Sequence, residues 1–129
     1  MIFVDSTVWI DYFNGRATRQ TDYLDGILGK EPLVIGDINY IEVLQGFRKD
    51  SDFERARILF DTLFFREVLS REIAIIGARN YRWLRKKGIT VRKTIDMIIG
   101  TFCIENQFTL LHDDRDFLPL ADHFGLKTV

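Results

Sequence analysis

The sequence is poor in the residues that build several common kinds of site. Cys103 is its only cysteine, so no disulfide can form within the chain. Neither of its two histidines, His112 and His123, has a partner for a metal site or for a Ser–His or Cys–His nucleophile pair, so both are interpreted as structural. Gly-rich phosphate loops of the GxxxxGK and GxGxxG types are also missing, which argues against a nucleotide-dependent enzyme.

Long apolar runs, prolines and excess charge are equally scarce. No apolar stretch approaches the ~20 residues that a membrane-spanning helix needs, and no basic region precedes the apolar start at Ile2, as it would in a signal peptide. We therefore expect a cytoplasmic protein with no membrane segment, in line with the single cysteine. The formal net charge of −1 means that a polyanion would have to be held by a local patch or a metal.

The 129 residues, 47% hydrophobic and 29% charged, suit one ordinary globular domain, predicted to span residues 1–129. Short apolar runs, which predict strands, alternate with segments of helical spacing. Strands are predicted at 2–4, 33–36, 65–69, 109–112 and 127–129, and helices at about 7–12, 18–28, 38–48, 52–63, 71–87, 95–106 and 113–124. This alternation predicts an α/β sandwich around a short, mainly parallel sheet.

Several carboxylates follow predicted strands. Asp5 lies at the carboxyl end of the first strand, and Asp114 and Asp116 follow the carboxyl end of the strand at 109–112. In open parallel sheets, ligands bind outside the carboxyl ends of the strands. Two acidic sites at two such ends could therefore meet in one crevice.

Two further acids lie on predicted helices. Asp96 interrupts an apolar run, and the residues that share its helix face include Gly100 and Cys103, so this carboxylate does not lie on a solvated face. Glu42 lies inside the helix that follows residue 37. Both acids have a glycine four residues later, Gly46 and Gly100, which leaves room for another backbone or a ligand.

Each acid alone has a plainer interpretation. Asp5 could be a helix cap, Glu42 a partly exposed helix residue and Asp96 an acid stabilised by the helix dipole. Asp114 and Asp116 could belong to a solvated loop. Together they favour a metal site. Two like charges about 4 Å apart repel by about 4 kcal/mol at an effective dielectric constant near 20, so a proton or a cation must relieve them. Mg²⁺ or Mn²⁺ prefers such oxygen ligands and can activate a water against a phosphodiester.

Four segments, in this order and at these separations, resemble the PIN domain family, and specifically its VapC-type toxin ribonucleases. They are residues 3–11 (Phe-Val-Asp-Ser-Thr-Val-Trp-Ile-Asp), 41–46 (Ile-Glu-Val-Leu-Gln-Gly), 94–100 (Thr-Ile-Asp-Met-Ile-Ile-Gly) and 110–117 (Leu-Leu-His-Asp-Asp-Arg-Asp-Phe). The resemblance implies a three-layer α/β/α sandwich, Mg²⁺ or Mn²⁺ as cofactor, cleavage of RNA, a homodimer and inhibition by a VapB-type antitoxin encoded alongside.

The resemblance also implies roles for particular residues. It makes Asp5, Glu42, Asp96 and Asp114 the core acids and Asp116 an accessory acid, all catalytic and metal-binding. Thr7 matches a position that supports the first acid. Independently of the resemblance, Thr94 is predicted to cap the helix that carries Asp96 and to lie, like Thr7, behind the metal-binding acids. The choice of Asp114 over Asp113 rests on alignment with the segment Asp-Arg-Asp-Phe.

Basic residues crowd the stretch before Asp96. They could contact the RNA backbone, or they could form a solvated helix face with a basic carboxyl end. Trp83 and Tyr81 could stack on bases, but packing in the core is the favoured prediction. The candidate backbone contacts are Arg82, Arg85, Lys86, Lys87, Arg92 and Lys93.

Three functions compete. The first is a metal-dependent endoribonuclease, the toxin of a type II toxin–antitoxin system. The second is a phosphoryl-transfer enzyme of the haloacid dehalogenase kind, but that class needs an acid two residues after the strand-end aspartate, where this chain has Thr7. The third is a non-catalytic RNA- or protein-binding module on the same fold. Large apolar residues between positions 18 and 64 also predict an exposed patch, and with it a homodimer and a groove for an amphipathic antitoxin segment. They include Tyr23, Leu24, Phe47, Phe53, Phe60 and Phe64.

Overall fold

The computed structural model describes all residues from Met1 to Val129, and they separate into two compact units. The first unit comprises Met1–Glu67 with Leu111–Asp113, and the second comprises Val68–Leu110 with Asp114–Val129. That residues 1–129 form one domain stays a prediction. None of the helices combines the length and the apolar character that crossing a membrane requires.

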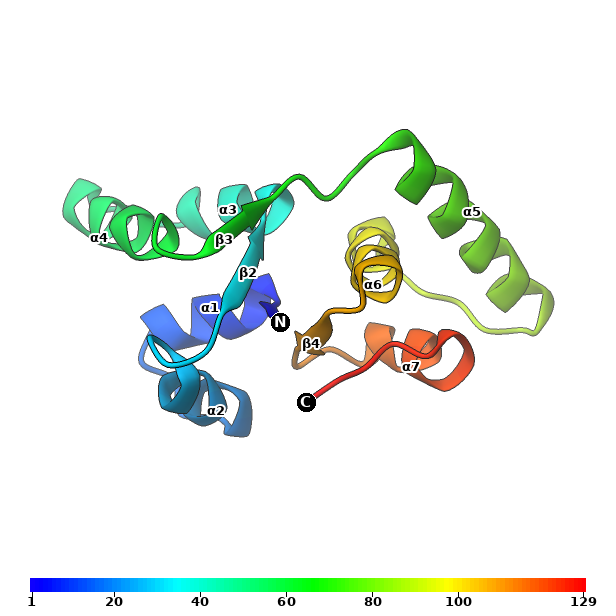
Figure 1. Cartoon of the computed structure of the whole chain (residues 1–129), viewed down its shortest axis with the longest axis horizontal. Coiled ribbons are helices and arrows are strands. Elements are labelled where there is room, and N and C mark those ends of the chain that lie inside the picture. The colour runs from blue at the N-terminus through cyan, green and yellow to red at the C-terminus, as the bar shows by residue number, and fades with distance from the viewer. The chain divides into compact units, whose positions relative to one another are not determined.

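The first unit holds three parallel strands and four helices (Figure 1). Strand β1 pairs with β2 in the register Ile2 to Leu33, and β2 pairs with β3 in the register Val34 to Phe64. The strand order of the whole sheet is β3-β2-β1-β4. The elements are β1 (Ile2–Val4), α1 (Ser6–Phe13), α2 (Arg19–Ile27), β2 (Leu33–Gly36), α3 (Asp37–Leu44), α4 (Asp50–Phe60) and β3 (Phe64–Arg66).

Strands β1 and β2 form the buried centre of this sheet. Phe3, Val4 and Val34 have no exposed surface, as expected for parallel strands that are covered on both faces. Strand β3 differs, because Phe64 and Phe65 are both more than half exposed. It is an edge strand, and it begins one residue earlier and ends three residues earlier than predicted.

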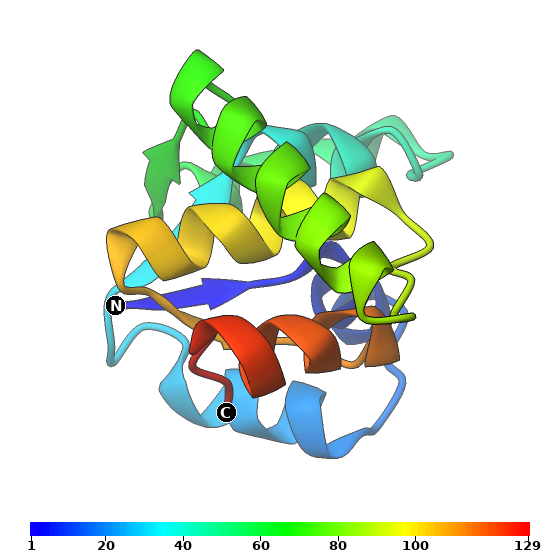
Figure 2. The ribbon, with the colours of Figure 1, turned by 90° about the vertical axis from the view of Figure 1, so that its right-hand side faces the viewer.

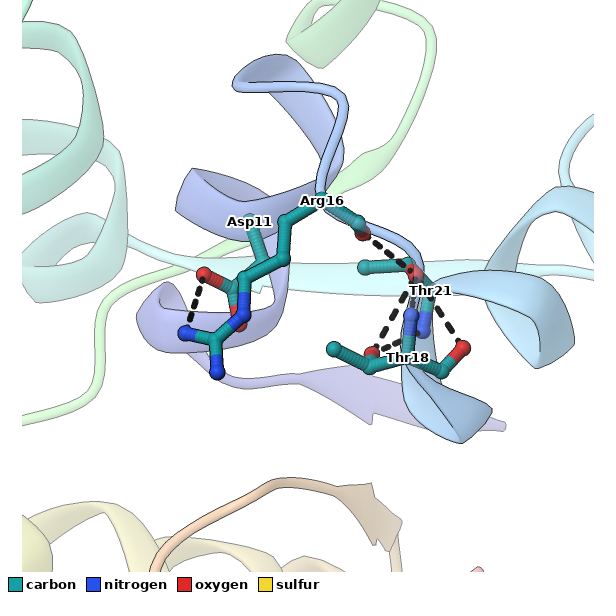
Figure 3. Close-up of polar contacts among 4 residues, drawn as sticks. All are labelled: Asp11, Arg16, Thr18 and Thr21. Atoms are coloured by element: carbon teal, nitrogen blue, oxygen red, sulfur yellow. Dashed lines mark hydrogen bonds and ion pairs between the residues drawn. The ribbon is translucent and has the colours of Figure 1, made fainter.

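The connection from α1 to α2 is held by side chains (Figure 3). Thr18 caps α2: its hydroxyl accepts the Thr21 N–H at 3.0 Å, and the Thr21 hydroxyl oxygen accepts the Thr18 N–H at 2.8 Å. The Thr21 hydroxyl also donates to the Arg16 carbonyl at 2.9 Å. Arg16 in turn forms an ion pair with Asp11 of α1 at 3.7 Å, so the turn joins both helices.

Three ends of the helices predicted at 38–48 and 52–63 are wrong, since α4 also ends at Phe60 rather than at residue 63. Helix α3 ends at Leu44 rather than at residue 48, because the chain tightens there: the Gly46 N–H bonds to the Val43 carbonyl and the next N–H to the Leu44 carbonyl. Helix α4 begins at Asp50, before the predicted start at residue 52, because the Lys49 carbonyl already accepts the first helical hydrogen bond. Propensity patterns fix such ends poorly.

The second unit is mainly helical. Helix α5 begins after Ser70, whose hydroxyl accepts the Ile73 N–H at 3.1 Å, and it packs along α6 (Figure 2). The predicted last strand is reduced to an isolated parallel bridge from Leu110 to Thr128. The elements are α5 (Arg71–Lys86), α6 (Thr94–Asn106), β4 (Thr109–Leu111, whose last residue belongs to the first unit), the 3-10 turn η1 (Arg115–Phe117) and α7 (Leu118–Phe124).

Helix α6 is the most buried helix of the chain, and Gly100 lies where it meets α7. A Cβ at Gly100 would collide with the side chain of Leu120, which is itself fully buried, and would lie 3.6 Å from Phe117. The room that the sequence predicted at Gly100 is therefore filled by another side chain of the unit. Gly77 of α5 differs, since a Cβ there would meet only Thr101 Oγ1 at an ordinary 3.7 Å.

We expect Gly100→Ala to destabilise the protein and Gly77→Ala to stabilise it. Overpacking at Gly100 costs about 1–3 kcal/mol, which exceeds the gain in helix propensity of up to about 1 kcal/mol. At Gly77 only the gain in helix propensity applies, because no overpacking opposes it. Urea unfolding of both variants measures the difference. A similar rise in unfolding free energy for both would show that the contact between Gly100 and Leu120 does not limit the packing.

Candidate active site

Three carboxylates come together in the second unit. Asp96 lies in the first turn of α6, Asp114 is the N-cap residue of η1, and Asp116 lies inside η1. One oxygen from each can be chosen so that all three lie within 4.8 Å of one another. Asp96 and Asp116 are buried, with 5% and 7% of their surface exposed, and Asp114 is half-buried. We call these three residues the acidic triad.

The local fold of η1 places two of these acids. Asp114 Oδ1 accepts the backbone N–H of Asp116 at 2.9 Å, which closes the first turn of η1. Asp114 is therefore a helix cap and a member of the triad at once. Asp113, its neighbour in the sequence, is exposed.

Two basic residues contact the acidic triad. Lys93 Nζ lies 3.0 Å from Asp114 Oδ2, and Arg92 Nε lies 3.5 Å from Asp116 Oδ1. The hydrogen bond to Asp114, together with the negative charges of Asp114, Asp96 and Asp116, raises the pKa of the Lys93 ammonium. Sequence reasoning placed Arg92 and Lys93 only against an RNA backbone and missed these contacts.

The acidic triad suits a hard divalent cation. Its donors are all carboxylate oxygens, which Mg²⁺ and Mn²⁺ prefer. Asp116 Oδ2 is buried and has no hydrogen-bond partner, and such an atom is costly unless a cation or a water satisfies it. The two neighbouring cations offset only part of the charge of three carboxylates. The residues present therefore fit a divalent metal.

Asp5 lies in the first unit, directly after β1, and is 4% exposed. It occupies the N-cap position of α1, yet its side chain makes no capping hydrogen bond; Asp5 Oδ2 instead accepts the Thr7 hydroxyl at 3.0 Å. Ser6 and Thr7 are the first two residues of the helix itself. Burial raises the pKa of Asp5 to about 6, against the lowering effect of the Thr7 hydrogen bond and with a smaller contribution from the charge of Glu42.

Glu42 is held by a relay of hydrogen bonds between α3 and α1. Ser6 Oγ donates to Glu42 Oε1 at 2.8 Å, and Asn39 Nδ2 donates to Ser6 Oγ at 2.8 Å. Asn39 is fully buried. Sequence reasoning missed this role of Ser6 and Asn39. The spacing of three residues between Asn39 and Glu42, which puts both on one helix face, was the available sign.

The other predicted supporting residue, Thr94, is the first residue of α6, two positions before Asp96. Lys93 rather than Thr94 holds the N-cap position. Thr94 lines a cavity of about 440 Å³ between α5 and α6, mostly apolar, with Arg82 also in its lining.

The aromatic residues of α5 are less buried than predicted. Trp83 is 41% exposed and contacts the rings of His123 and Phe124, so the prediction that it packs in the core is only partly right. Two basic side chains lie over these rings: Arg85 over Tyr81 at 5.7 Å, and Lys87 over Trp83 at 5.3 Å. Cys103 is buried, as predicted.

A parallel sheet with helices between its strands, together with a cluster of three carboxylates, defines an α/β protein with an acidic site. The profile of the PIN domain family matches residues 2–122. The chain therefore belongs to the PIN domain family, as the four sequence segments predicted.

The chain is similar to several characterised proteins. It is 29% identical to Ribonuclease VapC1 from Methanocaldococcus jannaschii over 126 residues, which cover 98% of this chain and 85% of that one. The structure is similar to that of VapBC2 from Rickettsia felis bound to a DNA fragment from its promoter, with a TM-score of 0.76, 16% identity and coverage of 100% and 98%. It is also similar to VapBC-1 from nontypeable Haemophilus influenzae, with a TM-score of 0.73, 19% identity and coverage of 100% and 97%. These likenesses confirm the predicted fold class, an α/β/α arrangement around a short parallel sheet.

We expect Asp5→Asn to change how the stability of the protein in EDTA depends on pH. Because the folded-state pKa of about 6 lies above the ordinary 3.8, the folded protein keeps a proton in this window that the unfolded chain has released. Wild-type stability therefore falls as pH rises through the window, by about 3 kcal/mol in total. Asparagine has no carboxyl to ionise, so the unfolding free energy of Asp5→Asn should not fall in this way over the same pH range. Urea unfolding of both proteins at pH 4 and pH 8 measures it, and parallel pH curves would contradict the expectation.

Proposed function

We propose that this chain is a metal-dependent endoribonuclease, the toxin component of a type II toxin–antitoxin pair, acting in the cytoplasm. The single observation that carries the proposal is the acidic triad, three carboxylates gathered within 4.8 Å in a chain of the PIN domain family. The curated relatives it matches carry the name VapC ribonuclease, which agrees with this activity.

Mg²⁺ or Mn²⁺ is the proposed cofactor, with Asp96, Asp114 and Asp116 as its ligands. When bound, such a cation supplies an activated water and stabilises the leaving oxygen of the phosphodiester. We propose that Asp5 and Glu42 serve the same reaction, because the family resemblance makes them core acids of the active site. The hydrogen bonds from Thr7 and Ser6 fix the direction of these two carboxylates.

The basic residues of α5 are proposed to hold the RNA backbone. Arg82, Arg85 and Lys86 are exposed on this helix, and Lys87 follows it directly. A chain with a net charge of −1 needs such a local patch to attract a polyanion.

The two alternatives have less support. A haloacid dehalogenase-like enzyme needs an acid where Thr7 stands, and Thr7 instead donates a hydrogen bond to Asp5. A non-catalytic binding module would have no need to keep buried carboxylates together, which is costly without a cation. The cleavage assay described below decides between catalysis and binding alone.

We further propose a homodimer that binds a VapB-type antitoxin. A cavity of about 640 Å³ in the first unit lies among α1, α3 and α4. Its lining includes the apolar residues Phe13, Phe47 and Leu59 and the basic residues Arg48 and Arg55. Its aromatic and basic lining suits an amphipathic segment that carries acidic residues.

The exposed apolar surface of the first unit supports the homodimer. Of the large apolar residues in this region, Leu24 and Phe60 are buried, so the predicted patch would have to come from others. Ile41 of α3 and Ile58 of α4 are exposed by 60% and 61%, and Phe64 by 56%. Side chains of this size and exposure are typical of an interface.

We expect the protein to be a dimer, and Ile58→Glu to shift it toward monomer, because a carboxylate in an apolar interface is costly to desolvate. Light scattering at tens of micromolar measures the change. Ile75→Glu is the matched control, since Ile75 is a 45% exposed isoleucine on α5 in the second unit. A wild-type monomer, or equal behaviour of both variants, would contradict the proposed surface.

We expect purified protein to cleave RNA and to leave 5′-phosphate and 3′-hydroxyl ends. The chain offers no histidine pair for the route through the ribose 2′-hydroxyl, so its carboxylates and their cation must carry the reaction. Asp96→Asn keeps the shape of the side chain and removes its charge, and the rate should fall by about 100-fold or more. Gel analysis of total cellular RNA with Mg²⁺, and with EDTA, measures both effects.

Two controls make this assay decisive. Millimolar Mg²⁺ should raise the melting temperature of the wild type but not of Asp96→Asn, because only a folded metal site is stabilised by binding. Addition of the accompanying antitoxin should stop cleavage. Cleavage that survives EDTA and leaves a 2′,3′-cyclic phosphate, or equal rates in both proteins, would overturn the mechanism.

A further inference from the structure

Lys93 stands at a position where the physics of the helix disfavours a cation. It is the N-cap residue of α6, and its side chain makes no capping hydrogen bond. Ser, Thr, Asp and Asn are the favoured caps, and the positive end of the helix dipole repels an ammonium. Lysine also holds the N-cap of α4, at Lys49, so the role of Lys93 has to be argued from the contact that its side chain makes.

The contact that Lys93 makes gives a reason for its presence. Asp114 has two carboxylate oxygens: Oδ1 accepts the Asp116 N–H at 2.9 Å, and Oδ2 lies 3.0 Å from Lys93 Nζ. A cation that binds Asp114 through Oδ2 must share that oxygen with the ammonium or displace it. A cation bound through Oδ2 would therefore meet the Lys93 ammonium directly.

We propose that Lys93 competes with the divalent cation for Asp114, and that its ammonium, once displaced, binds a phosphate of the RNA substrate. This inference rests on the proposed function, because it assumes that the acidic triad binds the metal. It assigns Lys93 a positioning role that the family resemblance does not give to this residue.

The charges around the acidic triad favour such an exchange. Three carboxylates face two basic side chains, Lys93 and Arg92, so one negative charge remains. A divalent cation turns this into one excess positive charge, which repels the nearest ammonium and attracts a phosphate. The Lys93 ammonium can move from Asp114 to such a phosphate, because its side chain is 59% exposed and has a flexible stem.

The test measures Mn²⁺ affinity by titration calorimetry and, separately, KM for RNA at saturating metal. Lys93→Met should bind Mn²⁺ about tenfold more tightly, because the competing charge is gone, yet its KM for RNA should rise about tenfold. Lys93→Arg should stay near the wild type in both. Lys127→Met is the matched control: Lys127 is an exposed lysine of the same unit without an ion pair, and its replacement should leave both values unchanged.

Opposite effects on metal and RNA distinguish this role from that of a structural tether, whose loss would weaken both. Unchanged or weaker Mn²⁺ binding in Lys93→Met, or an unchanged KM, would overturn the inference while leaving the proposed function intact. A wild type that binds no Mn²⁺ would overturn the proposed function and the inference with it. Melting curves in EDTA report folding, and Lys93→Gln, which keeps a hydrogen-bond donor, replaces Lys93→Met if the latter does not fold.

Discussion

Buried negative charge is the constraint around which this molecule is organised. Asp5, Asp96 and Asp116 are all nearly inaccessible to water, where an ionised carboxylate is stable only with a proton, a hydrogen-bond donor or a cation nearby. The structure meets this need in different ways. Asp5 has a raised pKa and the Thr7 hydroxyl, whereas the acidic triad has Lys93 and Arg92.

Apolar packing holds the carboxylates in these buried positions, although burial disfavours their charged form. Phe3 and Val4 of β1 are fully buried, and Asp5 is the residue at which the chain leaves the sheet. The close approach of Leu120 to Gly100 fixes α6 against α7, and with it the first turn that carries the buried Asp96. Protein interiors are close-packed, so a side chain on such an element has little freedom to avoid its neighbours. Packing energy thus maintains an electrostatic arrangement that would otherwise relax.

The sequence alone predicts those features that follow from local pattern. Strands β1 and β2 lie at their predicted positions, because continuous apolar runs have one favourable environment in a parallel sheet. The start of α5 at Ser70 and the acids of the triad were also predictable. The relay from Asn39 through Ser6 to Glu42 was not, because it joins residues more than thirty positions apart. The end of α3 and the cap of α6 depend on single hydrogen bonds that residue preferences do not resolve.

Two departures from local rules lie within one group of residues, although lysine also holds the N-cap of α4, at Lys49. Helices α2 and α5 begin with hydroxyl caps, at Thr18 and Ser70, as helix physics prefers. Helix α6 instead has a lysine at its N-cap, and close to it Asp116 has a buried oxygen without a hydrogen-bond partner. Sequences tend to satisfy local preferences unless another requirement outweighs them. Both exceptions belong to the acidic triad and its basic neighbours, and a site that must exchange cations gives one requirement that accounts for both.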